Sequence, residues 1–158
     1  MAMELLQETI LSSAIGSVQF SSIPTDGSYS DLFIVMRYEP GSGSDTYYRF
    51  NNYTSSNYKV QGFGTTGSNT VAYNDTYSYQ ILDGYPYNTY NHAIAIINII
   101  DYVYPGKNRT SYAHHGTGEG VGFAGNMWNQ TPAVNSVTLT NSQNFQADSV
   151  FQLFGVVA

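Results

Sequence analysis

The chain has no cysteine, few charged residues and no long hydrophobic run. The lack of cysteine excludes disulfide bonds, thiolate nucleophiles, and cysteine-ligated zinc or iron–sulfur centres. A membrane-spanning helix needs about 20 apolar residues in succession, and no segment of this sequence approaches that length. Packing and hydrogen bonds must therefore hold the fold together.

Charge is scarce and mainly acidic. Charged residues make up 10% of the chain, with 11 acids against 5 bases and a net charge of −6. Nucleic-acid binding needs clusters of Lys and Arg that displace counterions, and anionic membranes attract basic segments. We therefore expect neither a nucleic acid nor a membrane as partner. The start, Met1-Ala-Met-Glu, lacks a basic region and a long apolar region, so no secretory signal is expected.

The abundant residues favour strands and turns. Thr, Tyr, Val, Ile and Phe are strand formers, Gly, Asn, Ser and Asp are turn formers, and the good helix formers Ala, Glu, Lys and Arg are scarce. A length of 158 residues fits one domain, and 42% hydrophobic residues supply one core. We expect a single domain over residues 1–158.

Strand patterns recur along the whole chain. Around Val18 and Phe20 apolar and polar residues alternate, which predicts a strand with one buried face. Residues 32–36 and 93–100 are almost entirely apolar, which predicts strands in the centre of a sheet, whereas residues 107–115 are polar and predict an edge strand. Roughly ten or eleven such strands, without a convincing helix, predict an all-β antiparallel sandwich or barrel.

Residues that could carry chemistry are few. Neighbouring residues of a strand point to opposite faces, so His114 and His115 cannot both bind one metal ion from a regular strand. One of them could bind metal together with Glu119, although a polar strand end is the simpler interpretation. His92 is the remaining histidine. Two distant carboxylates of a glycosidase also remain open. We assign no catalytic, cofactor-binding or metal-binding residue and expect a protein without enzymatic activity.

Tyrosine is the one residue type whose abundance asks for an explanation. Its ring offers a large contact area and a polar tip, which suits protein interfaces and sugar-stacking platforms. Tyr77 and Tyr79 are equally compatible with ordinary strand positions. The tyrosines around Pro86 and in the turn that follows residues 93–100 fit exposed contact loops better. The candidate partner-binding residues are Tyr85, Tyr87, Tyr90, Tyr102 and Tyr104.

Several segments, in order along the chain, resemble those of small bacteriophage virion proteins. They are spread along the chain from Val18 to Gly155, and the stretch from 62 to 90 matches least. The matching segments are Val18-Gln-Phe-Ser-Ser-Ile-Pro24, Tyr29-Ser-Asp-Leu-Phe-Ile-Val35, Tyr48-Arg-Phe-Asn51 with Ser56-Asn-Tyr58, Met127-Trp-Asn-Gln-Thr-Pro-Ala-Val-Asn-Ser-Val-Thr-Leu139, and Asn144-Phe-Gln-Ala-Asp-Ser-Val-Phe-Gln-Leu-Phe-Gly155.

The resemblance implies a jelly-roll β-sandwich that decorates a virion and has no catalytic residues. The leading hypothesis is a capsid decoration or cement protein, made in the host cytoplasm. It would bind the major capsid protein on the outer capsid surface as a homotrimer, without a cofactor. The second hypothesis is a tail fibre or receptor-binding module that recognises host glycans through the tyrosine loops. An enzyme acting on polysaccharide is the third.

Overall fold

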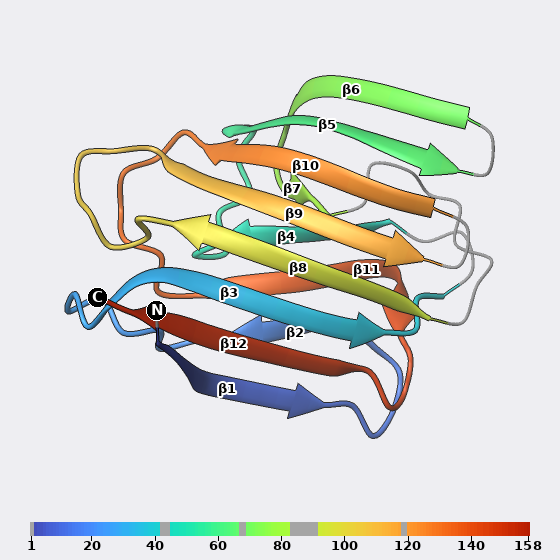
Figure 1. The fold of residues 1–158 in the computed structure, drawn as a ribbon, viewed down its shortest axis with the longest axis horizontal. Helices are drawn as coiled ribbons and strands as arrows, with labels where there is room; N and C mark the ends of the chain where they lie inside the picture. The colour runs from blue at the N-terminus through green and yellow to red at the C-terminus, as the bar shows by residue number, and fades with distance from the viewer. Residues whose placement is uncertain (1, 42–44, 67–68, 83–91, 118–119) are drawn as a thin grey trace.

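The computed structural model describes residues 2–41, 45–66, 69–82, 92–117 and 120–158. Within these residues twelve strands form two antiparallel sheets, and no helix is present (Figure 1). The expected all-β, jelly-roll-type antiparallel sandwich is confirmed. Correspondingly, the described chain holds no helix of the length and apolarity that crossing a membrane requires.

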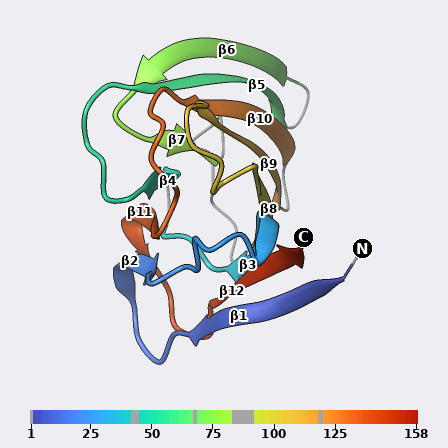
Figure 2. The ribbon, with the colours of Figure 1, turned by 90° about the vertical axis from the view of Figure 1, so that its left-hand side faces the viewer.

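The two sheets differ in size and lie face to face (Figure 2). The large sheet has the order β1 (Met3–Ile10), β12 (Val150–Val157), β3 (Tyr29–Tyr38), β8 (Ala93–Ile100), β9 (Arg109–Thr117), β10 (Gly120–Trp128), β5 (Tyr58–Thr66), β6 (Asn69–Tyr77). The small sheet has the order β2 (Ile15–Phe20), β11 (Val137–Phe145), β4 (Thr46–Phe50), β7 (Gln80–Ile81).

The core lies between the sheets and is built by strict alternation. In β3, Leu32, Ile34 and Met36 are fully buried, while the residues between them are only partly buried. The same alternation in β12 buries Phe151 and Leu153, which pair with Met36 and Ile34. Because successive side chains of a strand point to opposite faces, the inward faces of strands from both sheets form a single hydrophobic cluster.

Aromatic rings fill one end of this core. The indole of Trp128 stacks on Tyr58 at 6.1 Å between centroids, and its other neighbours are Phe50 and Tyr53 at 5.7 and 5.8 Å. These rings come from β4, β5, β10 and the turn after β4. Contacts between rings from separate strands tie the small sheet to the large one.

The expectation of an edge strand at 107–115 is wrong. β9 lies between β8 and β10 in the interior of the large sheet. Its polar side chains Arg109 and Ser111 point inward and are fully buried. Polarity did not indicate an edge here, because hydrogen bonds inside the sandwich satisfy these side chains.

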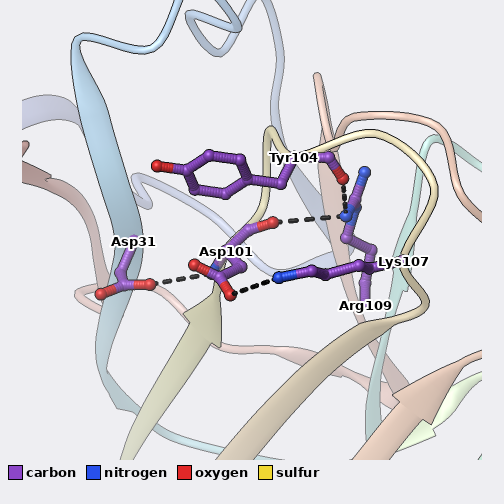
Figure 3. A network of polar contacts seen from close by, with 5 residues as sticks. All are labelled: Asp31, Asp101, Tyr104, Lys107 and Arg109. Atoms are coloured by element: carbon purple, nitrogen blue, oxygen red, sulfur yellow. Dashed lines mark hydrogen bonds and ion pairs between the residues drawn. The ribbon is translucent and has the colours of Figure 1, made fainter.

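Arg109 joins two loops to the sheet, and Figure 3 shows its contacts with one of them, at Asp101 and Tyr104. Its guanidinium donates to the carbonyl oxygens of Tyr104, of Asp101 at 3.3 Å, and of Thr131 and Pro132 at 2.7 and 3.1 Å. The amide of Asp101 in turn donates to Asp31 Oδ1 at 2.8 Å. A buried cation that satisfies four carbonyl groups holds the turn after β8 in one conformation.

Candidate functional site

The outer face of the large sheet carries many exposed apolar side chains. On β8 the inward residues Ala95, Ile97 and Ile99 are fully buried, but Ile94 and Ile96 point outward and are 56% and 39% exposed. Strand 93–100 is therefore central in its sheet, as expected, but only one of its faces is covered. Contiguous apolar surface of this kind marks a contact site for a protein or a ligand.

The outer face of the small sheet is different. There Ser17 and Gln19 of β2 alternate with buried residues, and Thr138 and Thr140 of β11 pair directly with them. Hydroxyl and amide groups suit a face in contact with water. Ile15, on the same side of β2, is 45% exposed, so this outer face is mixed and its polar residues lie on β2 and β11.

Two rows of paired residues form what we call the aliphatic half of the outer face. Across β8, β9, β10 and β5, cross-strand pairing aligns one row of four residues and a second row beside it. The first row is Ile96, His114, Phe123 and Phe63, and the second is Ile94, Gly116, Val121 and Thr65. Val121 and Phe63 are 62% and 55% exposed. None of the eight positions in these rows carries Asp, Glu, Lys or Arg.

A third row forms what we call the trough. It runs through Asn98, Tyr112, Gly125, Gln61 and Asn74 on β8, β9, β10, β5 and β6. Two shallow hollows lie along it and share Tyr112. The first, of about 580 Å³, is lined by Phe33, Ile96, Asn98, Tyr112, His114 and Phe123. The second, of about 350 Å³, includes Lys59, Gln61, Asn74, Thr110, Tyr112, Gly125 and Met127 in its lining.

Aromatic rings form one wall of the first hollow. The ring of Phe123 lies 5.8 Å from Tyr112 at an angle of 26° and 4.8 Å from His114 at 73°. On its far side Phe63 lies 5.9 Å away. Side chains from β5, β9 and β10 therefore form a continuous aromatic surface that opens to solvent.

The two neighbouring histidines point to opposite faces, as the strand geometry requires. His114 lies on the outer face, whereas the Nδ1 of His115 donates to the carbonyl oxygen of Leu82 at 3.0 Å. Burial lowers the pKa of His115, and the Leu82 hydrogen bond offsets part of this effect. His115 is therefore a neutral structural residue.

No group of three or more His, Asp or Glu side chains within the described residues could hold a metal ion. His92 Nδ1 lies 3.2 Å from a carboxylate oxygen of Glu39 on the surface. Glu119, considered above as a partner of a histidine, lies outside the described residues.

The five tyrosines predicted as contact residues have different outcomes in the structure. Tyr102 is fully buried and its hydroxyl donates to the Pro24 carbonyl, so its prediction as a contact residue is wrong. Burial also raises the pKa of Tyr102 to about 12. Tyr104, at the same turn, is 50% exposed and remains a candidate. The candidates Tyr85, Tyr87 and Tyr90 lie outside the described residues.

Tyr77 and Tyr79 belong to a separate aromatic group near β7. Their rings stack at 5.2 Å and 17°, and Tyr79 also lies 4.6 Å from Tyr47. The guanidinium of Arg49 sits over the Tyr47 ring at 4.9 Å and donates to the Ser78 carbonyl at 2.9 Å. Since Tyr77 also packs against the core, these tyrosines are accounted for by local packing.

The trough could not be recognised from the sequence. Its residues come from five strands, and each looks like an ordinary outward position in its own strand. One signal was available, because a strand that is apolar at nearly every position, such as 93–100, has either two covered faces or one apolar face open to a partner.

Comparison with known proteins gives no family. No protein-family model and no curated protein matches the chain. Among solved structures, the galectin LEC-6 of Caenorhabditis elegans is 8% identical with a TM-score of 0.38, and 96% of each chain is covered. A tetrameric galectin from the sponge Cinachyrella sp. is 14% identical with a TM-score of 0.37, and 90% of this chain and 99% of that chain are covered. Such low TM-scores carry no argument about function, so the fold assignment rests on the strand order and register described above.

Proposed function

We propose that this chain is a non-catalytic structural protein of a bacteriophage virion, which binds the outer surface of the capsid as a homotrimer and stabilises it. The observation that carries the proposal is the contrast between the two outer faces of the sandwich. One presents exposed Ile, Val and Phe side chains and has no formal charge in its aliphatic half, whereas the other presents Ser, Gln and Thr on β2 and β11 beside the exposed Ile15. A one-sided surface of this kind suits attachment.

Three further features support the same role. Several sequence segments between Val18 and Gly155 resemble those of small virion proteins. The net charge of −6 disfavours the interior of a capsid, where the packaged genome is also anionic. Many weak contacts, repeated over a shell, sum to stable attachment by multivalency.

The copy number in purified virions tests the proposal. A capsid decoration protein should be present in hundreds of copies and should appear on the shell in images of the particle. Capsids that lack it should release their DNA at a lower temperature or after a milder osmotic shock. A handful of copies, confined to the tail, would contradict the proposal.

The contact surface is tested by substitution. The double variant Ile94→Ser/Val121→Ser removes two exposed apolar side chains from the aliphatic half. We expect it to lose at least 10-fold in affinity for capsids that lack the protein. The matched control, Ser17→Ala/Gln19→Ala, changes two exposed residues on the outer face of the small sheet and should bind like wild type. Equal capsid binding by both variants would show that the aliphatic half does not contact the capsid.

A tail fibre or receptor-binding module that recognises host glycans is the second candidate function. The observation that favours it is the trough, where aromatic and amide side chains lie together on an open surface. Location at the tail in images of the particle, together with binding to host cells by the purified protein, would support this function over the first.

A further inference from the structure

We infer that the trough is a saccharide-binding site, in which Tyr112 and Phe123 contact the apolar face of a sugar ring and Gln61 and Asn74 bind hydroxyl groups. The inference goes beyond the decoration role. The site shares Ile96, His114 and Phe123 with the aliphatic half, whereas Ile94 and Val121 line neither hollow. The inference rests on the second candidate function and supplies the site residues for its glycan.

A sugar ring presents an apolar face of C–H groups and a rim of hydroxyl groups. A site for it needs an aromatic surface and hydrogen-bonding side chains within reach of each other. The first hollow supplies the aromatic surface, since Tyr112 and Phe123 are nearly parallel and both line it. Phe33 and Ile96 extend this surface toward β3 and β8.

The first hollow also holds a polar group that lacks a partner. Asn98 Oδ1 is buried, yet within the described chain it accepts no hydrogen bond. Leaving a buried acceptor unpaired costs about 1–3 kcal/mol. The terminal torsion of an asparagine side chain is broad, so the amide can turn toward a ligand hydroxyl. Neither an aliphatic ligand nor a flat apolar protein surface would satisfy this group.

The second hollow supplies amide groups. Gln61 and Asn74 are exposed, both line the hollow, and no hydrogen bond to the side chain of either is found within the described residues. An amide offers both donors and an acceptor, which matches the mixed donor and acceptor character of a hydroxyl group. Lys59, beside them, is the one formally charged residue in this lining, and no carboxylate lines it.

A glycine keeps the trough open. Gly125 lies between Tyr112 and Gln61 in the row. A Cβ at this position would have its nearest neighbours at 3.8 and 3.9 Å, which is ordinary contact, so the core does not require glycine here. A glycine inside a strand marks a point where another molecule can approach the backbone. From Tyr112 to Asn74 the row crosses three strand spacings, about 14 Å, which accommodates more than one sugar ring.

Saturation-transfer NMR on the purified protein tests the inference. The probes are methyl glycosides of glucose, galactose, mannose and N-acetylglucosamine, followed by an array of neutral and carboxylated oligosaccharides. We expect saturation transfer to the C–H groups of at least one probe and binding to a subset of the array. A preference for carboxylated over neutral oligosaccharides would indicate that Lys59 binds the carboxylate of the ligand. Absence of binding to every probe would overturn the inference.

Two variants locate the site. Gly125→Val places a β-branched side chain in the trough, where strands tolerate it, and Gln61→Ala/Asn74→Ala removes two exposed amides without touching the core. Each should weaken saccharide binding at least 10-fold. The control Ile94→Ser/Val121→Ser, in the aliphatic half, should bind sugar like wild type. Unchanged binding by both trough variants would overturn the inference.

The same variants separate the two proposals. Trough variants that lose sugar but still bind capsids leave the decoration role intact. Loss of capsid binding by Ile94→Ser/Val121→Ser with unchanged sugar binding supports both proposals. If Gly125→Val instead changes the oligomeric state measured by light scattering, the trough is an interface between copies of this chain, and the saccharide assignment is wrong.

Discussion

Gly122 lies directly beside the imidazole of His115. A Cβ at position 122 would come within 2.0 Å of His115 Cε1. The ring cannot move aside freely, because its Nδ1 is bonded to the Leu82 carbonyl. The glycine is therefore needed at position 122 for its lack of a side chain.

Gly122→Ala should lower the free energy of unfolding by about 1–3 kcal/mol, which is typical of overpacking. Urea denaturation followed by circular dichroism measures this. The matched control is Gly116→Ala in the neighbouring strand, where a Cβ would meet nothing within 4 Å. That control should be neutral or slightly stabilising. Equal effects of the two substitutions would show that the His115 ring does not exclude a side chain at position 122.

The lowered pKa of His115 predicts that the stability of the protein depends on pH. Its pKa in the folded protein is lowered, so as the pH falls below about 6.5, the ordinary pKa of histidine, the unfolded chain takes up a proton that the folded chain resists. The free energy of unfolding should therefore decrease as the pH is lowered below about 6.5. The contribution of His115 to this free energy should be fully present above that pH.

Urea titrations at a series of pH values measure this effect. His115→Gln should flatten the dependence over this range. A wild-type protein with constant stability between neutral pH and the lowered pKa would contradict the assignment.

At the scale of the element, β8 shows how one strand serves two roles. Ile97 is fully buried between the sheets, and its neighbour Ile96 is 39% exposed on the outer face. The same residue type therefore packs the core at one position and lines the candidate site at the next. The composition of the strand does not separate these roles, but its period of two does.

Substitution by lysine separates the two faces of β8. Ile97→Lys would bury an unpaired charge and should cost several kcal/mol, enough to unfold a protein of ordinary stability. Ile96→Lys places the charge in solvent and should leave the fold intact. Circular dichroism and size-exclusion chromatography measure both results. A folded Ile97→Lys protein would show that the strand register is wrong.

The turn after β8 depends on β9. Arg109 on β9 satisfies carbonyl groups of two separate loops, and the buried Tyr102 hydroxyl fastens the same turn to Pro24. From the sequence this turn was a candidate contact loop, and only Tyr104 keeps an exposed ring. Tyrosine in a turn next to proline and glycine does not by itself separate a surface ring from a buried one.

At the scale of the whole molecule, the two sheets share one core that contains the only tryptophan. Trp128 is 1% exposed and touches rings from β4 and β5. Because the core joins both sheets, we expect unfolding to be cooperative.

In urea, Trp128 fluorescence and the circular dichroism of the strands should change in one transition with the same midpoint. Phe50→Leu, next to the indole, should shift both midpoints together. Separate midpoints would mean that the two sheets unfold independently.

Strand content and core alternation followed from the sequence, because the period of two is a local property that sterics impose on each strand. The alternation around Val18 and Phe20 and the opposite directions of His114 and His115 were predicted for the same reason. The position of β9 could not be predicted, because a polar strand can lie inside a sheet when its side chains find partners across the sandwich, as Arg109 does.

The amino-acid order alone determined that this chain forms strands, that each has an apolar face, and that no thiol chemistry is available. The tertiary structure decided which faces meet and which stay open. Strand order and register arise from hydrogen bonds between residues far apart in the chain. Those pairings bring Asn98, Tyr112, Gly125, Gln61 and Asn74 into one row, and they leave the outward isoleucines of β8 uncovered.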